Sequence, residues 1–325
     1  MNDEAPNRPT LELWGNADWD DAWVSRAGVL SALHLAGLDL SDRPQLGAGA
    51  DFSTLTWRAC QGQHFADDRY QGWAKILDVA DARHRKAWEW AAILETARLG
   101  GVLVEGKSAV GFGVGTEPLS AALARFGMLV TATDLPMNDD ESDHWASAAQ
   151  HAASKDNLRH PAICRDAEFD QRVEFVAADM NALPAEIENR KFDFAWSSCV
   201  IEHLGSPAKG FDFVRHCFDL LKPGGIMIHT TEYELTAQHE TQDYGHCAVY
   251  RQEDFSELAD YFRAQGCSID VDLGVSLAMP EDRWISSQAV PGAYDDGYAE
   301  PAHLRLVIGD SVATSFAIVV QRPAD

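Results

Sequence analysis

Three glycines at alternate positions, Gly111, Gly113 and Gly115, stand where an apolar stretch gives way to a helix-forming one. Glycine has no Cβ atom, so a turn built from it lets the backbone approach a ligand closely. Thr116 follows at the start of the helix-forming stretch and joins the candidate ligand-binding residues. Taken alone, this pattern favours a binding loop no more than it favours an ordinary tight connection between a strand and a helix.

The residues around this turn favour a nucleoside with a positively charged group over a dinucleotide. The dinucleotide pattern requires a glycine three positions after its second glycine, but Thr116 or Pro118 stands there. Glu117 also places a negative charge where a pyrophosphate would lie against the helix N-terminus. The same charge would attract a sulfonium or an ammonium group.

Two aspartates close the next two apolar stretches. Asp134, followed by Leu135, comes about 20 residues after the turn, the spacing at which a carboxylate accepts hydrogen bonds from ribose hydroxyls. Asp179 is placed to accept a hydrogen bond from an adenine amine, with Met180 against the ring. Each aspartate alone could be a helix cap or a turn residue, but together with the glycines they predict an adenosine site.

Candidate catalytic residues follow the fourth apolar stretch, in the run Ser197-Ser-Cys-Val-Ile-Glu-His203. We expect Ser197 and Ser198 to lie near the cofactor. His203 suits a general base because the unperturbed pKa of histidine is near neutrality, and Glu202 would orient it. A role for this pair in supporting hydrogen bonds is equally favoured. His229 opens the polar run His229-Thr-Thr-Glu-Tyr233 and is the third catalytic candidate, because it could line the pocket for an acceptor.

A second group of polar residues raises the question of a metal ion. The group comprises His239, Glu240, His246 and Cys247, together with His229 or Glu232. Its spacing matches no established ligand pattern, so solvated histidines on a mobile lid are favoured. We therefore predict no metal site.

The elements that position these residues alternate between apolar strands and longer helical stretches, which is typical of a parallel sheet with crossover helices. A helix is predicted over Arg85–Leu99, ending at Gly100 and Gly101, and another over Asp254–Gln265. The final two strands have no helix between them, which allows an antiparallel pair. The candidate strands are Ser108–Gly113, Leu129–Asp134, Val173–Ala178, Phe192–Ser198, Gly225–Thr231, Ser268–Leu273 and Thr314–Gln321.

The chain divides into a tryptophan-rich first part and a ligand-binding remainder. We predict a helical N-terminal extension over residues 1–100, a domain over residues 101–325, and lid loops near 234–250 and 279–303. Core packing is favoured over a substrate cage for the aromatic residues of the extension. The tryptophans concerned are Trp14, Trp19, Trp23, Trp57, Trp73, Trp88 and Trp90.

In their order and spacing, these motifs resemble those of the class I S-adenosylmethionine-dependent methyltransferases. The resemblance covers roughly Lys107 to Tyr233 and rests on the turn at Gly111–Gly115, Thr-Ala-Thr-Asp ending at Asp134, Ala-Ala-Asp-Met ending at Met180, the stretch Phe192–Leu204, and Leu-Lys-Pro-Gly-Gly at 221–225. It implies a doubly wound, mostly parallel seven-stranded α/β sheet with the cofactor across the carboxyl ends of the first strands. Gly111 stands where the family usually has an acidic residue, and Glu117 replaces its third glycine. Glu117 is therefore expected to hold the methionine ammonium.

Composition narrows the class of partner. With 51 acidic and 26 basic residues, the formal charge of −25 disfavours nucleic acid and anionic membrane surfaces as partners. The six cysteines show no Cys-x-x-Cys spacing, which indicates reduced thiols in the cytoplasm. No apolar run approaches the ~20 residues that span a bilayer. We expect a cytoplasmic protein with a small-molecule acceptor, and the sequence leaves the oligomeric state open, a homodimer included.

The leading hypothesis is methyl transfer from S-adenosylmethionine to an oxygen or nitrogen atom of a small-molecule or sugar-like acceptor. Two alternatives are kept. One is a nucleotide-dependent oxidoreductase or epimerase, which the missing third glycine and Glu117 oppose. The other is a non-catalytic protein that binds S-adenosylmethionine as a scaffold.

Overall fold

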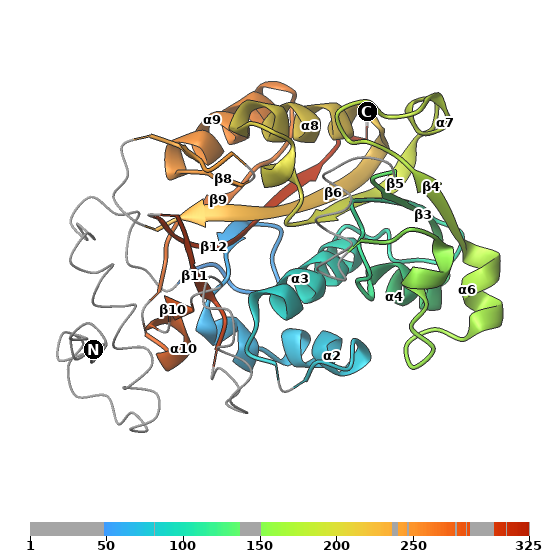
Figure 1. The fold of residues 1–325 in the computed structure, drawn as a ribbon, viewed down its shortest axis with the longest axis horizontal. Helices are drawn as coiled ribbons and strands as arrows, with labels where there is room; N and C mark the ends of the chain where they lie inside the picture. The colour runs from blue at the N-terminus through green and yellow to red at the C-terminus, as the bar shows by residue number, and fades with distance from the viewer. Residues whose placement is uncertain are drawn as a thin grey trace, which may run out of the picture.

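The computed structural model describes residues 49–80, 82–136, 151–235, 240–245, 247–276, 278–283, 285–286, 302–309 and 311–324. In these ranges the chain forms a ten-stranded mixed sheet with helices on both faces (Figure 1). Helices α8 (Pro207–Asp219) and α9 (Gln252–Ala264) lie on one side of the sheet, and α3 (Arg85–Leu99) and α4 (Leu119–Arg125) lie on the other. This doubly wound α/β arrangement confirms the predicted fold class.

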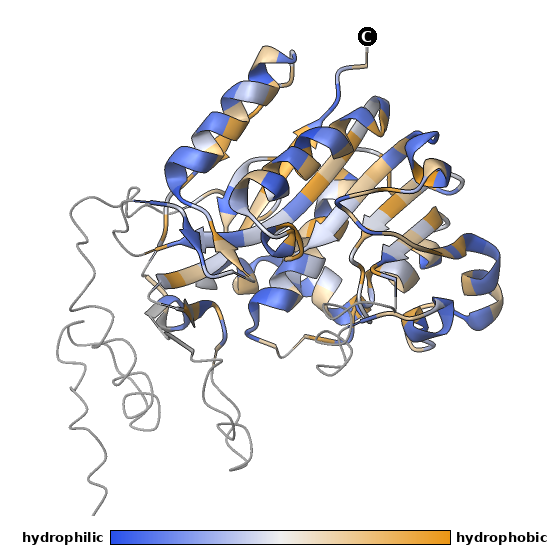
Figure 2. Ribbon diagram, turned by 45° about the horizontal axis from the view of Figure 1, so that its top comes forward, coloured by the Kyte–Doolittle hydropathy of each residue, from blue (hydrophilic) through white to orange (hydrophobic). Residues whose placement is uncertain are grey.

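Five strands form the parallel part of the sheet, in the spatial order β6-β5-β2-β3-β4. All seven residues of β5 are buried, as expected for a strand covered by helices on both faces. In Figure 2 the central strands are largely hydrophobic in colour, whereas hydrophilic residues gather on the helices. The bounds are β2 Ser108–Phe112, β3 Leu129–Asp134, β4 Val173–Ala177, β5 Phe192–Ser198 and β6 Leu221–Glu234.

The far side of the sheet is mostly antiparallel. β12 (Ser311–Gln321) runs antiparallel to β6, with Ala313 opposite Glu234 and Gln321 opposite Ile226. β11 (Arg305–Ile308) pairs antiparallel with the first residues of β12, and β10 (Ile285–Ser286) pairs parallel with β11. Both β6 and β12 begin several residues before the predicted strands, because Leu221 pairs with Phe192 of β5 and Ser311 pairs with Ile308 of β11.

The predicted sixth strand, Ser268–Leu273, is wrong in length and in partner. Only Val271–Asp272 form a strand, β9, which pairs with β1 (Trp57–Ala59). β1 in turn pairs antiparallel with β12, so a segment from the first part of the chain occupies the expected place of the sixth strand. The sheet among the described residues therefore has ten strands, and the stretch expected to be only helical contributes one of them.

The remaining described elements are short or lie at the edges of the sheet. α2 (Asp68–Ile76) packs on α3, and the hairpin β7 (Gln242–Asp243) and β8 (Ala248–Val249) follows β6. Among the described residues, no helix is long and apolar enough to cross a bilayer. The other elements are η2 (Gly62–Ala66), η3 (Lys155–Leu158), α6 (Asp166–Arg172), α7 (Ala185–Glu188), η4 (Ile201–His203) and α10 (Pro280–Arg283).

Core packing is confirmed for three of the tryptophans in the first part of the chain. Trp57, Trp73 and Trp88 are buried in the hydrophobic core. Trp14, Trp19 and Trp23 lie outside the described residues, as do parts of both predicted lid loops. The boundary near residue 100 and the two lids remain predictions.

Candidate active site

A cavity of about 640 Å³ opens at the carboxyl ends of β2, β3 and β5, beside the N-terminus of α3. Nine of the eleven predicted cofactor residues line it. Ligands of open α/β sheets bind at this edge, because successive strand-to-helix turns converge there. The nine are Gly113, Gly115, Thr116, Glu117, Asp134, Leu135, Asp179, Met180 and Ser198.

Two glycines of the turn require the absence of a side chain. Gly113 and Gly115 have φ angles of 56° and 52°, in the left-handed region. A Cβ atom on Gly113 would also lie 2.6 Å from Cγ1 of Val200. Gly111 does not line the cavity, and a Cβ atom there would lie 2.2 Å from the indole of Trp196. Glycine at 111 thus makes room for a core tryptophan.

Asp134 holds the turn in place from the end of β3. Its Oδ2 atom accepts hydrogen bonds from the backbone N–H groups of Gly115 and Ala152, each at 3.0 Å, and Oδ1 accepts one from Leu135 at 2.8 Å. Burial raises the pKa of Asp134, and these N–H donors partly offset the rise. Because two carboxylate oxygens offer about four acceptor positions, Asp134 retains capacity for a ligand hydroxyl.

The N-terminus of α3 supplies a cation that the sequence did not suggest. The helix begins after His84, whose Nδ1 atom accepts a hydrogen bond from the Lys86 N–H at 3.0 Å. Lys86 Nζ then reaches the Ser198 carbonyl oxygen at 2.8 Å and Glu117 Oε1 at 3.1 Å. Burial alone would lower the pKa of Lys86, but Glu117 and Glu89 raise it above its ordinary value. Lys86 therefore stays protonated in the wall of the cavity.

His203 is the one catalytic candidate that lines the cavity. Its Nε2 atom lies 3.9 Å from Oε1 of Glu202, which is completely buried behind it. The other Glu202 oxygen, Oε2, accepts a hydrogen bond from Thr231 Oγ1 at 3.0 Å. Burial and the neighbouring Glu232 carboxylate raise the pKa of Glu202. The two residues are thus brought together as predicted, with His203 toward the cavity.

The structure does not bring His229 or Ser197 to the cavity. Both are completely buried, and they contact each other, with Ser197 Oγ 2.8 Å from His229 Nδ1. Phe213 packs against the imidazole edge-on. Burial lowers the pKa of His229 to about 3, so its imidazole is neutral. These positions fit a core contact between β5 and β6 rather than contact with an acceptor.

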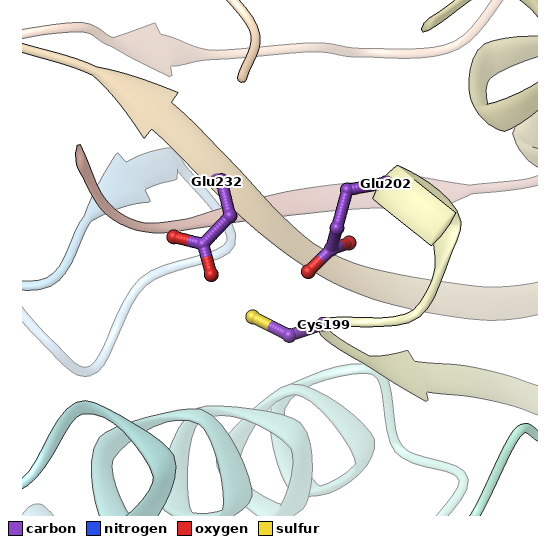
Figure 3. Close-up of side chains that lie close together, drawn as sticks. All are labelled: Cys199, Glu202 and Glu232. Atoms are coloured by element: carbon purple, nitrogen blue, oxygen red, sulfur yellow. The ribbon is translucent and has the colours of Figure 1, made fainter. Parts of the chain in front are cut away.

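An acidic group lies behind the cavity wall, where β5 and β6 end. Cys199, Glu202 and Glu232 point toward one another (Figure 3), and Glu232 Oε1 lies 2.7 Å from Arg85 Nη1. Burial and the Glu89 carboxylate raise the pKa of Glu232, and Arg85 opposes that rise. Of the polar residues considered earlier for a metal, only Glu232 belongs to this group, and His239 and His246 lie outside the described residues.

Several residues of the cavity carried little signal in the sequence. Lys86 and Trp90 stand one turn apart on a helix that otherwise reads as packing against the sheet. His151 and His160 also line the cavity, and their rings contact the backbone carbonyls of Leu135 and Thr116 at 2.7 and 3.0 Å. Among these four residues, only Lys86 carried a hint in the sequence, because a charged side chain was not needed for packing α3 against the sheet.

Comparison with known proteins finds a likeness to methyltransferases over part of the chain. Residues 110–229 match a family described as "Methyltransferase domain". The ubiquinone biosynthesis O-methyltransferase of Caulobacter vibrioides is 33% identical over 133 residues, which are 39% of this chain and 41% of that protein. The counterpart from Coxiella burnetii is 25% identical over 130 residues, 40% of this chain and 45% of that protein. The chain thus spans less than half the length of these curated relatives.

Solved structures with a similar arrangement include a putative sarcosine dimethylglycine methyltransferase from Galdieria sulphuraria. It is 14% identical with a TM-score of 0.42, and the match covers 79% of this chain and 99% of that chain.

Proposed function

We propose that this chain methylates an oxygen or nitrogen atom of a small-molecule or sugar-like acceptor, as a class I S-adenosylmethionine-dependent methyltransferase. The match of residues 110–229 to the family described as "Methyltransferase domain" supports this. The observation that carries the proposal is one cavity shared by the glycine turn, Asp134 and His203. S-adenosylmethionine, when bound, supplies a methyl group activated by the sulfonium charge. Transfer of that group is an in-line displacement, so the protein mainly aligns the acceptor.

The cavity residues fit the parts of this cofactor. The turn at Gly113 and Gly115 leaves backbone open to a ligand, and Asp134 is already fixed at the point where a ribose would meet it. Asp179 and Met180 lie in the same wall and would receive the adenine. This division follows from the chemistry of the groups: a carboxylate accepts from hydroxyl and amine donors, and a thioether packs on a ring.

The amino-acid end of the cofactor would meet the pair Lys86 and Glu117. Lys86 Nζ and Glu117 Oε1 lie 3.1 Å apart, one offering a positive charge and the other a negative charge in the cavity wall. A zwitterionic methionine group carries both signs, so each end would find an opposite charge. Glu117 therefore takes the ammonium, and Lys86 takes the carboxylate.

His203 would accept the proton that an alcohol or phenol must lose, and Glu202 would orient the imidazole from behind. A neutral amine acceptor would not need this base. Ser197 and His229 act in our proposal through the packing of β5 on β6, since neither reaches the cavity. The relatives' acceptors are not carried over, because the matches span under half of those proteins.

The proposal is tested in two measurements on the full chain. Isothermal titration with S-adenosylhomocysteine should show a binding affinity in the micromolar range, and NAD(P) should not bind. A screen of cell extract with a methyl-tritiated donor should then yield a labelled small molecule. Binding without any label transfer would favour the non-catalytic scaffold, and absence of binding would contradict both.

His203→Ala separates the base from the cofactor site. We expect turnover of a hydroxyl acceptor to fall by roughly 10²–10⁴-fold with unchanged S-adenosylhomocysteine affinity. His216→Ala is the matched control, because His216 lies on α8 and pairs with Glu188 at 2.8 Å, away from the cavity. Full activity in His203→Ala would remove His203 from the mechanism.

The proposal also includes a cytoplasmic location and a small acceptor that is neither nucleic acid nor membrane, and it leaves the oligomeric state open, a homodimer included. All six cysteines are free in the structure, which suits a reducing compartment. Light scattering coupled to size exclusion would measure the assembly, and fractionation of cells that express the chain would measure the location.

A further inference from the structure

Three side chains meet behind the cavity wall from three different elements (Figure 3). Cys199 lies in the turn after β5, Glu202 in η4 and Glu232 near the end of β6. One sulfur or oxygen atom from each lies within 4.8 Å of the others. The side chain of Glu202 is completely buried, and that of Glu232 is 3% exposed. The group is therefore built into the sheet edge and is not a solvated acidic surface.

Negative charge exceeds positive charge around this group. Arg85 forms ion pairs with two carboxylates, Glu232 at 2.7 Å and Glu89 at 3.3 Å. Lys86 likewise lies 3.2 Å from Glu89 and 3.1 Å from Glu117. Two cations thus face four carboxylates: Glu89, Glu117, Glu202 and Glu232. The two carboxyl groups left without a cation must be neutralised, either by protons or by one divalent cation.

Two oxygen atoms in the group have no hydrogen-bond partner. Among the described residues, Oε1 of Glu202 and Oε2 of Glu232 are buried and accept no hydrogen bond, and the atom nearest to Glu202 Oε1 in an ion-pair sense is His203 Nε2 at 3.9 Å. Buried carboxylate oxygens are costly without a partner, and an ion is one of the few groups that can supply it. Cys199 adopts a φ angle of 50°, which is unfavourable for a residue with a Cβ atom and is typical of functional sites. Its sulfur points toward the two carboxylates.

We propose that Cys199, Glu202 and Glu232 bind one divalent transition-metal cation, for which Zn²⁺ is the best match. Thiolate and carboxylate donors together suit Zn²⁺, whereas Mg²⁺ takes oxygen ligands only. Tetrahedral zinc draws its donors to about 3.5 Å from one another. The donor atoms lie within 4.8 Å of one another and must move closer, and Arg85 Nη1, which lies 3.2 Å from Cys199 Sγ and 2.7 Å from Glu232 Oε1, must shift to admit the ion.

Binding breaks the S–H bond of Cys199, forms a metal–sulfur bond and releases the proton to solvent. Three protein ligands leave a fourth position, as in catalytic zinc sites. Of the three proposed ligands, Cys199 also lines the cavity. Arg85 remains as the counter-ion of the ligand set.

The test uses the full chain without cofactor or acceptor, so its outcome is independent of the methyl-transfer proposal. The chain is stripped with a chelator and titrated with Co²⁺, and zinc uptake is measured by elemental analysis after dialysis. We expect one ion per chain and a thiolate-to-cobalt charge-transfer band. Cys199→Ser should lose the band, and Glu232→Gln should weaken binding by more than roughly 100-fold, beyond the loss typical of an outer-shell partner.

Cys217→Ser is the matched control, because Cys217 is also a free cysteine but is buried on α8, outside the acidic group. It should keep both the band and the stoichiometry. The nearly isosteric Glu232→Gln decides the matter if Cys199→Ser does not fold. Substoichiometric uptake by the wild-type chain would overturn the proposal and leave a proton shared between Glu202 and Glu232. A band that persists in folded Cys199→Ser, or affinity unchanged in Glu232→Gln, would overturn it equally.

Discussion

Asp134 accepts a hydrogen bond from the backbone N–H of Gly115 at 3.0 Å, so the carboxylate at the end of β3 fixes the turn at the end of β2. Asp134→Ala should therefore act twice, by loosening the turn and by removing the acceptor for ribose. Bonds to a charged group contribute about 1.5–3 kcal/mol each, so S-adenosylhomocysteine affinity should fall by at least roughly 10-fold. Titration calorimetry measures this, and an unchanged affinity would contradict the assignment.

Asp179→Ala provides the comparison. Asp179 lines the same cavity, but its side chain accepts a hydrogen bond from the nearby Asn181 N–H, at 2.8 Å, within its own turn, and is not seen to bond to the glycine turn. Its loss should weaken affinity without the fall in thermal stability expected of Asp134→Ala.

Gly113→Ala should damage the site more than the same change at another left-handed glycine. Gly113 has a φ angle of 56°, and a new Cβ atom would lie 2.6 Å from Val200. Gly101 has a φ angle of 69°, but nothing lies within 4 Å of its Cβ position. Both variants should lose about 1–2 kcal/mol through backbone strain. Only Gly113→Ala should also lose cofactor affinity, which denaturant unfolding and calorimetry together would show.

Lys86→Gln should weaken cofactor binding by removing the cation at the methionine end. The cofactor carboxylate would lose its cationic partner, and Glu117 would lose the lysine that lies 3.1 Å from it, so the affinity should fall. Lys75→Gln is the control, since Lys75 is exposed on α2 and does not line the cavity. Equal affinities for the two variants would assign Lys86 a purely structural role. The double variant Lys86→Gln, Glu117→Gln should bind more weakly than Lys86→Gln, because the cofactor ammonium then loses its partner as well.

The parallel half of the sheet and most of the cofactor wall could be predicted because local pattern determines them. β3, β5 and α3 have the predicted bounds, since apolar runs buried on both faces and a glycine-ended helix leave clear signals. The place of β1 could not be predicted, because three residues carry no usable period and their pairing with β12 joins positions far apart in the chain. The same holds for Lys86, whose role depends on where α3 docks.

His229 illustrates a second limit. Its position near the end of a strand suggested the cavity, but alternate residues of a strand face opposite sides of the sheet. His229 pairs in register with Ser197 and packs against Phe213 of α8, so it lies on the face of the sheet that α8 covers, whereas α3 lines the cavity on the other face. The position of a polar residue near the carboxyl end of a strand therefore does not predict on which face of the sheet its side chain lies.

Asp193→Asn should destabilise the fold at the opposite end of the sheet. Asp193 accepts hydrogen bonds from Lys222 Nζ at 2.7 Å, Lys107 Nζ at 2.9 Å and the Ser108 N–H at 2.9 Å. Burial alone would raise the pKa of Asp193, but these donors hold it well below its ordinary range. We expect the variant to lose roughly 1–3 kcal/mol in the free energy of unfolding at neutral pH.

The loss should depend on pH in a defined direction. A carboxylate whose pKa is lower in the folded state stabilises the protein fully above its unfolded pKa, and this contribution is lost as the pH falls toward the folded value. The difference in the free energy of unfolding between wild type and Asp193→Asn should thus stay constant at neutral pH and become smaller below about pH 4. Urea unfolding at several pH values measures it. Asp212→Asn, on the exposed face of α8, is the control and should differ little from wild type in the free energy of unfolding. A difference for Asp193→Asn that grows as the pH falls would contradict the assignment.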